Sequence, residues 1–277
     1  MLALAAARLG FKCHIYAPAG DNPAFDVAHS HSCAGYDDEQ ALAEFAAAVD
    51  VVTYEFENVP LKTAASLARH APLYPPAKAL EVSQDRVAEK SFLGDIGLKT
   101  ADWLHADDVE AVEVQAAREF DGRNRRGIVK TCRLGYDGKG QRSVADGSEM
   151  RAAWRLLGSV PCVLEQALDL QTEVSVVVAR TASGAFASYP VAENRHVDGI
   201  LDLTVVPASV PARIADRAVG LGMTIADALD YVGVLAVEFF VVDDELLVNE
   251  LAPRPHNSGH WTLDVAQTSQ FEQQIRA

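Results

Sequence analysis

The sequence predicts two domains: a partial parallel α/β domain over residues 1–82, followed by an α+β domain with antiparallel sheets over residues 83–277. Short strands and helices alternate before residue 83, which is typical of a parallel sheet. Beyond it strands predominate, and the apolar run VGVLAVEFFVVDDELLVNELA is typical of an antiparallel hairpin. A length of 277 residues suits roughly two domains.

The first domain is expected to be incomplete. Its residue patterns predict strands at 13–17 and 51–56, and helices at 39–49 and 61–70 before the proline-rich LYPPAK. The opening MLALAAARLG is read as a helix rather than a signal peptide, because its apolar run is short and no basic segment precedes it. The chain therefore starts halfway through a strand–helix unit, and we expect a strand before Met1. The helical pattern of SQFEQQIRA likewise predicts that further residues follow.

The second domain is expected to begin with a helix over 85–96. Arg86 and Lys90 are four residues apart on that helix and therefore share a face. A lid-like subdomain is expected over 103–164. The other predicted helices are 109–120, 147–157 and 212–229, and the predicted strands are 127–131, 160–168, 173–181, 185–193 and 201–209.

The composition limits the classes of partner. The net charge of −15, from 24 Lys and Arg against 39 Asp and Glu, argues against nucleic acid and anionic membranes, because binding to them depends on many cationic contacts. The four cysteines have no Cys-x-x-Cys spacing, which is typical of a reduced, cytoplasmic protein. A phosphate-bearing ligand would need a local site of Lys, Arg, backbone N–H groups or a metal.

The apolar hairpin contains two carboxylates that are costly to bury unpaired. Glu238 interrupts VLAVEFFVV, and Glu250 interrupts the returning strand. A two-residue turn at 243–244 would place Glu238 opposite Asn249, whereas a three-residue turn would place it opposite Glu250. Two facing carboxylates repel unless a cation lies between them, and oxygen ligands suit Mg²⁺. The hairpin thus predicts a magnesium site; the alternative is a glutamate that faces solvent at a sheet edge.

Three further segments carry residue types that bind nucleotides. The glycine-rich GYDGKGQ, residues 135–141, could close its N–H groups over an anion, with Lys139 adding charge; an Asp-Gly hairpin turn is the alternative. Lys130 lies in the apolar strand GIVKT, either at an exposed end or aimed at a phosphate. VLEQAL, residues 163–168, could hydrogen-bond an adenine edge, or could simply end a strand.

The stretch NELAPRPHNSGH, residues 249–260, concentrates polar groups directly after the hairpin. Arg254 offers a planar fork of hydrogen-bond donors. His256, Asn257 and Ser258 follow, just past the predicted metal site. The two prolines stiffen the loop, which reduces the entropy lost when it orders around a substrate. A rigid sheet-edge loop would explain the prolines but not the concentration of donors.

In order along the chain, these motifs resemble those of ATP-grasp enzymes: a lysine-bearing helix, Lys130, a glycine-rich loop, Glu165-Gln166, Glu173, and Glu238 with Asn249-Glu250. Within that superfamily, GYDGKGQ, ENRHVDGI, NELAPRPHNSGHW and the EFENVP segment resemble the N5-carboxyaminoimidazole ribonucleotide synthases. The similarity covers essentially the whole chain. It implies a pre-ATP-grasp domain followed by an ATP-grasp domain, and a homodimer.

The resemblance implies carboxylation of aminoimidazole ribonucleotide with bicarbonate and ATP, through carboxyphosphate, in purine biosynthesis. Mg²⁺, or Mn²⁺ in its place, would be held by Glu238 and Glu250. The expected substrate contacts are Arg254, His256, Asn257, Ser258, Tyr136, Asp137 and Glu57. The expected ATP contacts are Arg86, Lys90, Lys130, Gly135, Tyr136, Asp137, Gly138, Lys139, Gly140, Gln141, Glu165, Gln166, Ala167, Leu168, Glu173, His196, Asn249 and Glu250.

Some family features are expected to lie outside this chain. The glycine-rich first loop would precede Met1, and a small C-terminal domain, with basic residues for the ribonucleotide phosphate, would follow Ala277. Cys132 and Leu134 occupy places where related sequences often carry Arg or Gly. The alternatives are a formate-dependent glycinamide ribonucleotide transformylase, or a non-catalytic ATP-binding module.

Overall fold

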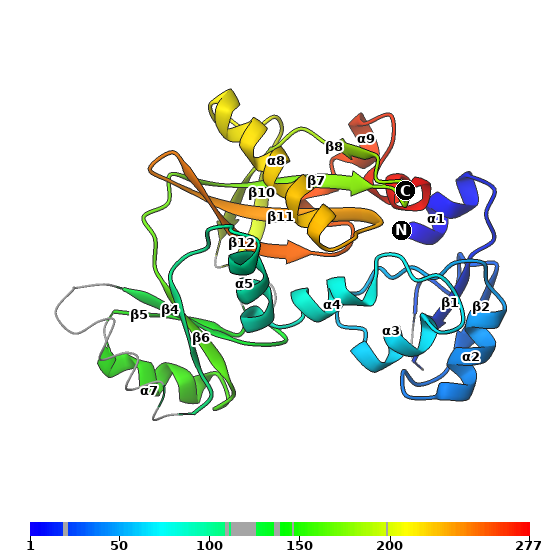
Figure 1. Ribbon diagram of the computed structural model, residues 1–277, viewed down its shortest axis with the longest axis horizontal. Helices are drawn as coiled ribbons and strands as arrows, with labels where there is room; N and C mark the ends of the chain where they lie inside the picture. Colours follow the sequence, from blue (N-terminus) through cyan, green and yellow to red (C-terminus); the bar gives the residue numbers. More distant parts are fainter. Residues whose placement is uncertain (19–21, 109–110, 112–125, 136–138, 146, 198) are drawn as a thin grey trace.

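The computed structural model describes residues 1–18, 22–108, 111, 126–135, 139–145, 147–197 and 199–277. The strands form a two-stranded parallel sheet, a four-stranded antiparallel sheet and a six-stranded antiparallel sheet (Figure 1). The predicted fold class is therefore confirmed, with a small parallel sheet first and antiparallel sheets after it. No helix among the described residues is long and apolar enough to cross a bilayer.

The N-terminal region is built around the small parallel sheet. β1 (His14–Ala17) pairs with β2 (Ser30–Cys33), and α2 (Glu39–Ala47) and α3 (Leu61–Leu67) contribute the buried apolar side chains beside it. Figure 1 shows both chain ends close together, because the N-terminal α1 (Leu2–Arg8) packs on the C-terminal α10 (Gln270–Arg276).

The strand expected at 51–56 was a wrong prediction. Val52 makes only an isolated parallel bridge, to Leu73. Tyr74 donates to Val52, but Pro72 and Pro76 hold the donor positions on either side of it, and neither has an N–H group that could extend the ladder. The β-branched run VVTYEF therefore has strand propensity but no partner long enough to form a strand.

Two helices lead into the second domain. α4 (Ala77–Ser83) is followed by α5 (Arg86–Asp95), as the predicted helix over 85–96 required. Asp85 caps α5, since its side chain accepts hydrogen bonds from the backbone N–H groups of Val87 and Ala88. Both helices pack against β12.

The four-stranded sheet lies at the far side of the molecule from the N-terminal region (Figure 1). Its order is β3 (Trp103–Ala106), β6 (Cys162–Gln166), β4 (Gly127–Thr131) and β5 (Gln141–Val144). α7 (Gly147–Leu156) covers it through Met150 and Ala153. The helix predicted at 109–120 lies outside the described residues except for residue 111.

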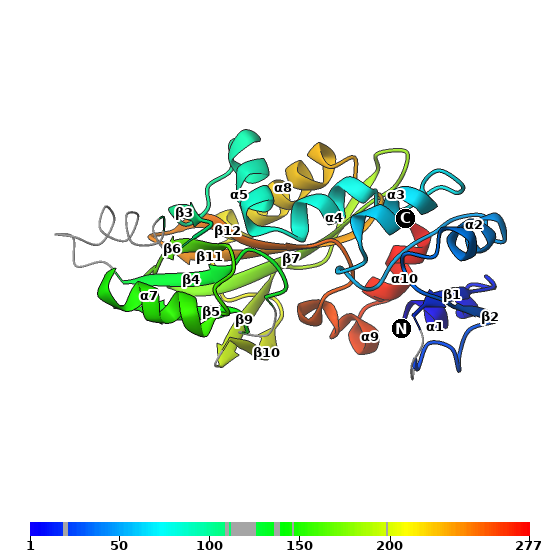
Figure 2. The ribbon, with the colours of Figure 1, turned by 90° about the horizontal axis from the view of Figure 1, so that it is seen from below.

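The six-stranded sheet forms the centre of the second domain. Its order is β10 (Ile200–Val205), β9 (Ala192–Val197), β7 (Thr172–Arg180), β11 (Gly233–Val242) and β12 (Glu245–Ala252), with β8 (Phe186–Ser188) beside β7. Figure 2 shows α4, α5 and α8 (Ala212–Ala228) on one side of this sheet and α9 (Thr262–Val265) on the other.

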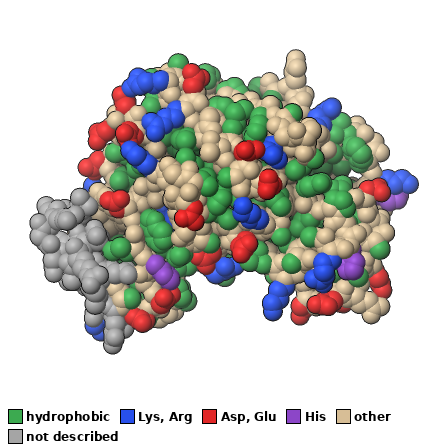
Figure 3. All heavy atoms as spheres, in the orientation of Figure 1, with side chains coloured by type: hydrophobic (Ala, Val, Ile, Leu, Met, Phe, Trp, Pro, Cys, Tyr) green, Lys and Arg blue, Asp and Glu red, His purple; other side chains and the backbone are tan. Residues whose placement is uncertain are grey.

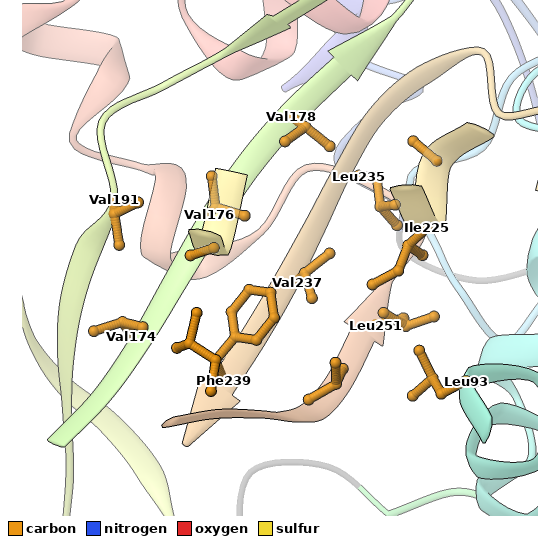
Figure 4. Packing of buried hydrophobic residues seen from close by; sticks show 14 of the residues in the cluster. Leu93, Val174, Val176, Val178, Val191, Ile225, Leu235, Val237, Phe239 and Leu251 are labelled. Carbon is orange, nitrogen blue, oxygen red and sulfur yellow. The ribbon is translucent and has the colours of Figure 1, made fainter. Parts of the chain in front are cut away.

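The main core lies between α8 and the six-stranded sheet. Figure 4 shows Val176 of β7 and Val237 and Phe239 of β11 packed together among the buried apolar side chains. α8 approaches the sheet closely at Gly222, where a Cβ atom would lie 3.0 Å from a methyl carbon of Val176. This apolar layer holds the strands that carry the polar residues on the opposite face.

A single strand predicted at 185–193 is two strands in the structure. β8 ends at Ser188 and β9 begins at Ala192. Pro190 lies between them and cannot donate to a ladder, so the run AFASYPVAE breaks there.

The hairpin of β11 and β12 combines features of both alternatives considered from the sequence. Its turn has two residues, because Val242 pairs with Glu245, and both turn residues have positive φ (48° and 63°), as a type I′ turn requires. Glu238 nevertheless lies opposite Glu250, because a β-bulge follows that pair and leaves Asn249 as the extra residue. The bulge turns both Asn249 and Glu250 toward one cavity.

Candidate active site

A cavity of about 300 Å³ lies where the four-stranded sheet, the six-stranded sheet and the loop after β12 meet. Most of the residues predicted for the site line it. They are Glu57, Arg86, Lys130, Gly135, Lys139, Gln141, Glu173, His196, Glu238, Asn249, Glu250, Arg254, His256 and Asn257. The structure therefore brings together side chains that are far apart in the sequence.

Glu238 and Glu250 form one side of the cavity. The Nδ2 group of Asn249 donates to Glu238 Oε2 at 3.3 Å, and His256 Nε2 lies 3.4 Å from Glu238 Oε1. Burial, and then the charge of Glu250, raise the pKa of Glu238 to about 7. Arg86 Nη1 lies 3.4 Å from Glu250 Oε2. These carboxylates repel each other but are held together, a donor set that fits a hard divalent cation such as Mg²⁺.

Glu165 holds two lysines behind the cavity wall. Lys90 Nζ lies 3.0 Å from Glu165 Oε1, and Lys130 Nζ lies 2.7 Å from Glu165 Oε2. Burial alone would raise the pKa of Glu165, but the ammonium groups of Lys130 and Lys90 outweigh it and hold that pKa at about 2. All three side chains are buried, and only Lys130 lines the cavity. Two cations against one anion leave a net positive charge at this wall.

His196 and Glu173 form a pair at the other wall. His196 Nδ1 lies 2.9 Å from Glu173 Oε2, and this contact, although burial opposes it, raises the pKa of His196. The two residues come from neighbouring strands, β9 and β7. The pair therefore presents a polar edge next to the carboxylates.

Apolar residues that were not predicted also line the cavity: Ile128, Leu170, Leu201 and Phe240, together with Gly199. Strand parity could have found two. Ile128 is two residues from Lys130, and Phe240 is two residues from Glu238, so each shares a face with a predicted site residue. Apolar side chains beside the lysines suit an aromatic base that lies next to its phosphates.

Arg254 pairs with Glu57, which comes from the N-terminal region. Its Nε donates to Glu57 Oε2 at 2.8 Å, and its Nη2 lies 2.7 Å from the same oxygen. Both side chains are about one quarter exposed at 24% and 23%, so the pair is accessible from the cavity that both residues line. The guanidinium also donates to the Pro255 carbonyl at 3.1 Å, which fixes its plane.

His256 is neutral at pH 7. Burial, and then the positive charge of Arg254, lower its pKa to about 4. Gln270 of α10 holds its backbone on both sides: His256 N donates to Gln270 Oε1 at 2.9 Å, and Gln270 Nε2 donates to His256 O at 2.7 Å. Gly259 is required beside this clamp, because a Cβ there would lie 2.3 Å from Gln270 Oε1.

Several predicted residues do not line this cavity. Ser258 is buried behind it, with 1% exposure. Gln166 and Leu168 line a different, shallow hollow of about 390 Å³ together with Lys99 and Glu245. Ala167 donates its backbone N–H to the carbonyl of residue 126. Tyr136, Asp137 and Gly138 lie outside the described residues.

Gly140 fixes the base of the glycine-rich loop. Its φ is +74°, and a Cβ there would lie 2.6 Å from Thr131 Oγ1. Its carbonyl accepts the Thr131 N–H at 2.8 Å. We expect Gly140→Ala to destabilise the protein by about 1–3 kcal/mol and to weaken ATP binding, because the loop must move away from Lys130. Thermal unfolding and ATP titration would measure both effects.

Gly220→Ala is the matched control for this substitution. Gly220 lies within α8, and nothing lies within 4 Å of a Cβ built there. Alanine should therefore stabilise the helix by about 0.5–1 kcal/mol and leave ATP affinity unchanged. If Gly140→Ala behaved like this control, the loop base would not depend on glycine.

Comparison with known proteins agrees with this geometry. A ribonucleotide synthetase preATP-grasp domain model matches residues 1–84, and an ATP-grasp domain model matches residues 91–271. The N5-carboxyaminoimidazole ribonucleotide synthase of Brucella melitensis is 49% identical to this protein. The alignment covers the whole of this chain and 76% of the Brucella protein. This chain belongs to the N5-carboxyaminoimidazole ribonucleotide synthase family of ATP-grasp enzymes.

Solved synthase structures share the fold. The structure of an ADP complex of N5-carboxyaminoimidazole ribonucleotide synthetase superimposes with a TM-score of 0.93 and 39% identity. The superposition covers the whole of this chain and 72% of the synthetase chain. The Aspergillus clavatus synthase, in complex with ADP and 5-aminoimidazole ribonucleotide, matches the whole chain and 72% of its own, with a TM-score of 0.88 and 26% identity. Family membership thus rests on both sequence and fold.

On the face of the molecule shown in Figure 3, acidic and basic side chains are interspersed among apolar ones. No continuous basic surface covers the described residues on that face. With a net charge of −15, the cations that matter for an anionic ligand are those of the cavity.

Proposed function

We propose that this protein carboxylates 5-aminoimidazole ribonucleotide with bicarbonate and ATP, forming N5-carboxyaminoimidazole ribonucleotide, ADP and phosphate. A bicarbonate oxygen attacks the γ-phosphorus of ATP, and the bond to the β,γ-bridging oxygen breaks so that ADP leaves. The exocyclic amine then attacks the carbon of carboxyphosphate, or the CO₂ that it releases. Phosphate departs, and the amine loses one proton. Family membership and the distribution of charge in the cavity support this proposal.

The proposed ATP site lies along the four-stranded sheet. Lys130 and Arg86 line the cavity and would neutralise phosphate oxygens, while Ile128 and Phe240 would cover the adenine ring. Lys90 contacts Glu165 rather than the cavity, so its charge would act through that buried pair. Lys139 and Gln141 line the cavity from the glycine-rich loop.

Glu238 and Glu250 are the proposed ligands of Mg²⁺ or Mn²⁺. Their positions opposite each other on paired strands, and the raised pKa of Glu238, support a cation between them. A bound Mg²⁺ would neutralise the charge of the transferred phosphoryl group. Asn249 and His256 would orient Glu238 through their contacts with its two oxygens.

The contact that most directly supports an oxyanion substrate is the Arg254–Glu57 pair beside the carboxylates. Arg254 would release part of its contact with Glu57 and fork onto bicarbonate or carboxyphosphate. Glu57 would then be free to accept a hydrogen bond from the amine or its departing proton. Asn257 lines the cavity nearby and would contact the ribonucleotide.

The deciding experiment measures ADP release with each substrate withheld in turn. The proposal expects release that requires both bicarbonate and 5-aminoimidazole ribonucleotide, and a product whose carboxyl carbon comes from labelled bicarbonate. ADP release that required formate and glycinamide ribonucleotide would indicate the transformylase instead. Tight ATP binding without ribonucleotide-dependent turnover would indicate a nucleotide-binding module. The homodimer implied by the family would be tested by analytical ultracentrifugation.

Arg254→Lys tests the oxyanion contact. It keeps the charge but loses the planar fork, so we expect turnover to fall by about tenfold to hundredfold, as for about 1.5–3 kcal/mol of lost charged hydrogen bonding. ATP affinity should change little, because the proposed ATP contacts lie at Lys130 and Arg86. Steady-state ADP release and ATP titration would separate the two effects.

Arg213→Lys is the matched control, because Arg213 forms an exposed pair with Asp244 at the turn of the hairpin. It should leave turnover unchanged. Equal losses of ATP affinity and turnover in Arg254→Lys would place Arg254 on the nucleotide phosphates. No loss in either would make the loop after β12 structural only.

A further inference from the structure

A chain of buried polar side chains runs behind the cavity to the ring of His256. It contains Ser175 of β7, Asn194 of β9 and Ser258 of the loop after β12, with exposures of 1%, 5% and 1%. Their side chains do not line the cavity that the described residues form. Three buried polar groups in contact with one another and with a site histidine call for a specific role, since buried polar groups cost free energy unless satisfied.

The hydrogen bonds in this chain point in one direction. Asn194 Nδ2 donates to Ser175 Oγ at 2.8 Å, while Asn194 Oδ1 accepts from Thr204 Oγ1 at 3.2 Å. Ser175 Oγ then donates to Ser258 Oγ at 2.8 Å. Because the oxygen of Ser258 accepts this bond, its own proton is available for the next partner, His256 Nδ1, at 2.9 Å.

A second contact fixes the direction independently. The backbone N–H of Ser258 donates to the same His256 Nδ1 at 3.3 Å, and a backbone N–H can only donate. Nδ1 therefore accepts from both the hydroxyl and the amide of Ser258. In a neutral imidazole the other nitrogen then carries the proton, so the N–H is at Nε2. That nitrogen faces Glu238 Oε1 at 3.4 Å.

We propose that Ser175, Asn194 and Ser258 are positioning residues that hold His256 in its Nε2–H tautomer and aim that N–H at Glu238. His256 then presents a protonated nitrogen, rather than a basic lone pair, to the Glu238 carboxylate that lies 3.4 Å away. The inference rests on the proposed function only in assigning Glu238 to the metal. The Gln270 clamp on the His256 backbone prevents the ring from shifting away from this chain.

The arrangement also explains why Ser258 is where it is. The family resemblance implied that Ser258, which follows His256 and Asn257 in the loop, would contact substrate. Its hydroxyl instead contacts Ser175 Oγ and His256 Nδ1, and Ser258 does not line the cavity. The hydroxyl of Ser175 and the amide of Asn194 extend the support across two neighbouring strands, so the geometry of the six-stranded sheet sets the orientation of the ring.

The direct test is ¹⁵N NMR of the imidazole rings in the protein without substrates. The protein has 8 histidines, and the signals of His256 are identified as those lost in His256→Gln. At neutral pH the proposal expects a protonated Nε2 and an unprotonated Nδ1. A protonated Nδ1 in the unmodified protein would overturn the proposal, whether or not the protein is a synthase.

Variants then test the hydrogen bonds from Ser175 through Ser258 to His256. Ser258→Ala should increase the fraction of the Nδ1–H tautomer, and turnover should fall by about tenfold to hundredfold, as for other groups that support a metal ligand. Ser175→Ala should change the His256 signals in the same direction by less. Ser175 does not line the cavity, and its hydroxyl donates to Ser258, so we expect the change to reach the ring through Ser258. Because the Ser175 backbone pairs with Glu238, the side-chain variant Ser175→Ala keeps that pairing intact.

Ser66→Ala is the matched control, because Ser66 is a buried serine (4% exposed) in α3 of the N-terminal region. It should leave the His256 signals and turnover unchanged. If Ser175→Ala remained folded and also left the His256 signals unchanged, the buried hydrogen bonds would not position the ring. If His256 showed the expected tautomer but the protein showed no ribonucleotide-dependent turnover, the proposed function would be contradicted and this inference would stand.

Discussion

Glu250→Gln is expected to lower Mg²⁺-dependent turnover by at least about a hundredfold, because it replaces one of the two proposed metal ligands with a neutral amide. The fold should persist, since the relief of repulsion between two facing carboxylates across β11 and β12 offsets the loss of the contact between Glu250 and Arg86. The measurements are ADP release against Mg²⁺ concentration and thermal unfolding without ligands. We expect turnover to be lost without a lower melting temperature.

Glu245→Gln makes the same chemical change at the other end of the same strand. Glu245 pairs with Lys99 at the surface, where its Oε2 lies 2.6 Å from Nζ. It should leave turnover and the Mg²⁺ dependence unchanged. Near-normal turnover of Glu250→Gln at modest Mg²⁺ would contradict the metal assignment, whereas equal losses in both variants would indicate damage to β12 as a whole.

The carboxylate pair was predictable from the sequence, but the route by which the fold achieves it was not. Strand alternation places two charged residues in an apolar hairpin, and their cost when buried predicts a cation. The turn type implied that Glu238 would face Asn249, and a bulge restores the pairing with Glu250. A bulge depends on backbone geometry that no residue type in this hairpin specifies.

Residues from distant segments were predictable only through the resemblance. Arg254 and Glu57 are 197 residues apart, and nothing in their local patterns links them. Periodicity does reveal which side chains share a face, so Phe240 and Ile128 could have been added to the site. Ser175 and Asn194 could not, because a serine or asparagine in a strand gives no sign of the partner that it meets across a sheet.

Glu165→Gln is expected to lower the free energy of unfolding at pH 7 by about 3–5 kcal/mol, because it leaves two buried ammonium groups without their counterion. The pKa of Glu165 is about 2 in the folded protein, against an ordinary value of 4.5. A carboxylate whose pKa is lowered by folding contributes stability above its unfolded pKa and loses it as the pH falls through the folded pKa. The difference between the wild-type protein and the variant should therefore be full near pH 7 and shrink as the pH falls from 4.5 toward about 2.

Urea unfolding monitored by circular dichroism would measure this difference, and a second substitution tests its cause. Lys130→Met removes one of the two ammonium groups that Glu165 neutralises. If the charge imbalance causes the loss, Lys130→Met should recover part of the stability of Glu165→Gln, so the double variant should lose less than the sum of the single variants. Additive losses would mean that Glu165 acts through packing alone. A difference that stayed constant down to pH 2 would mean that its ionisation is not linked to folding.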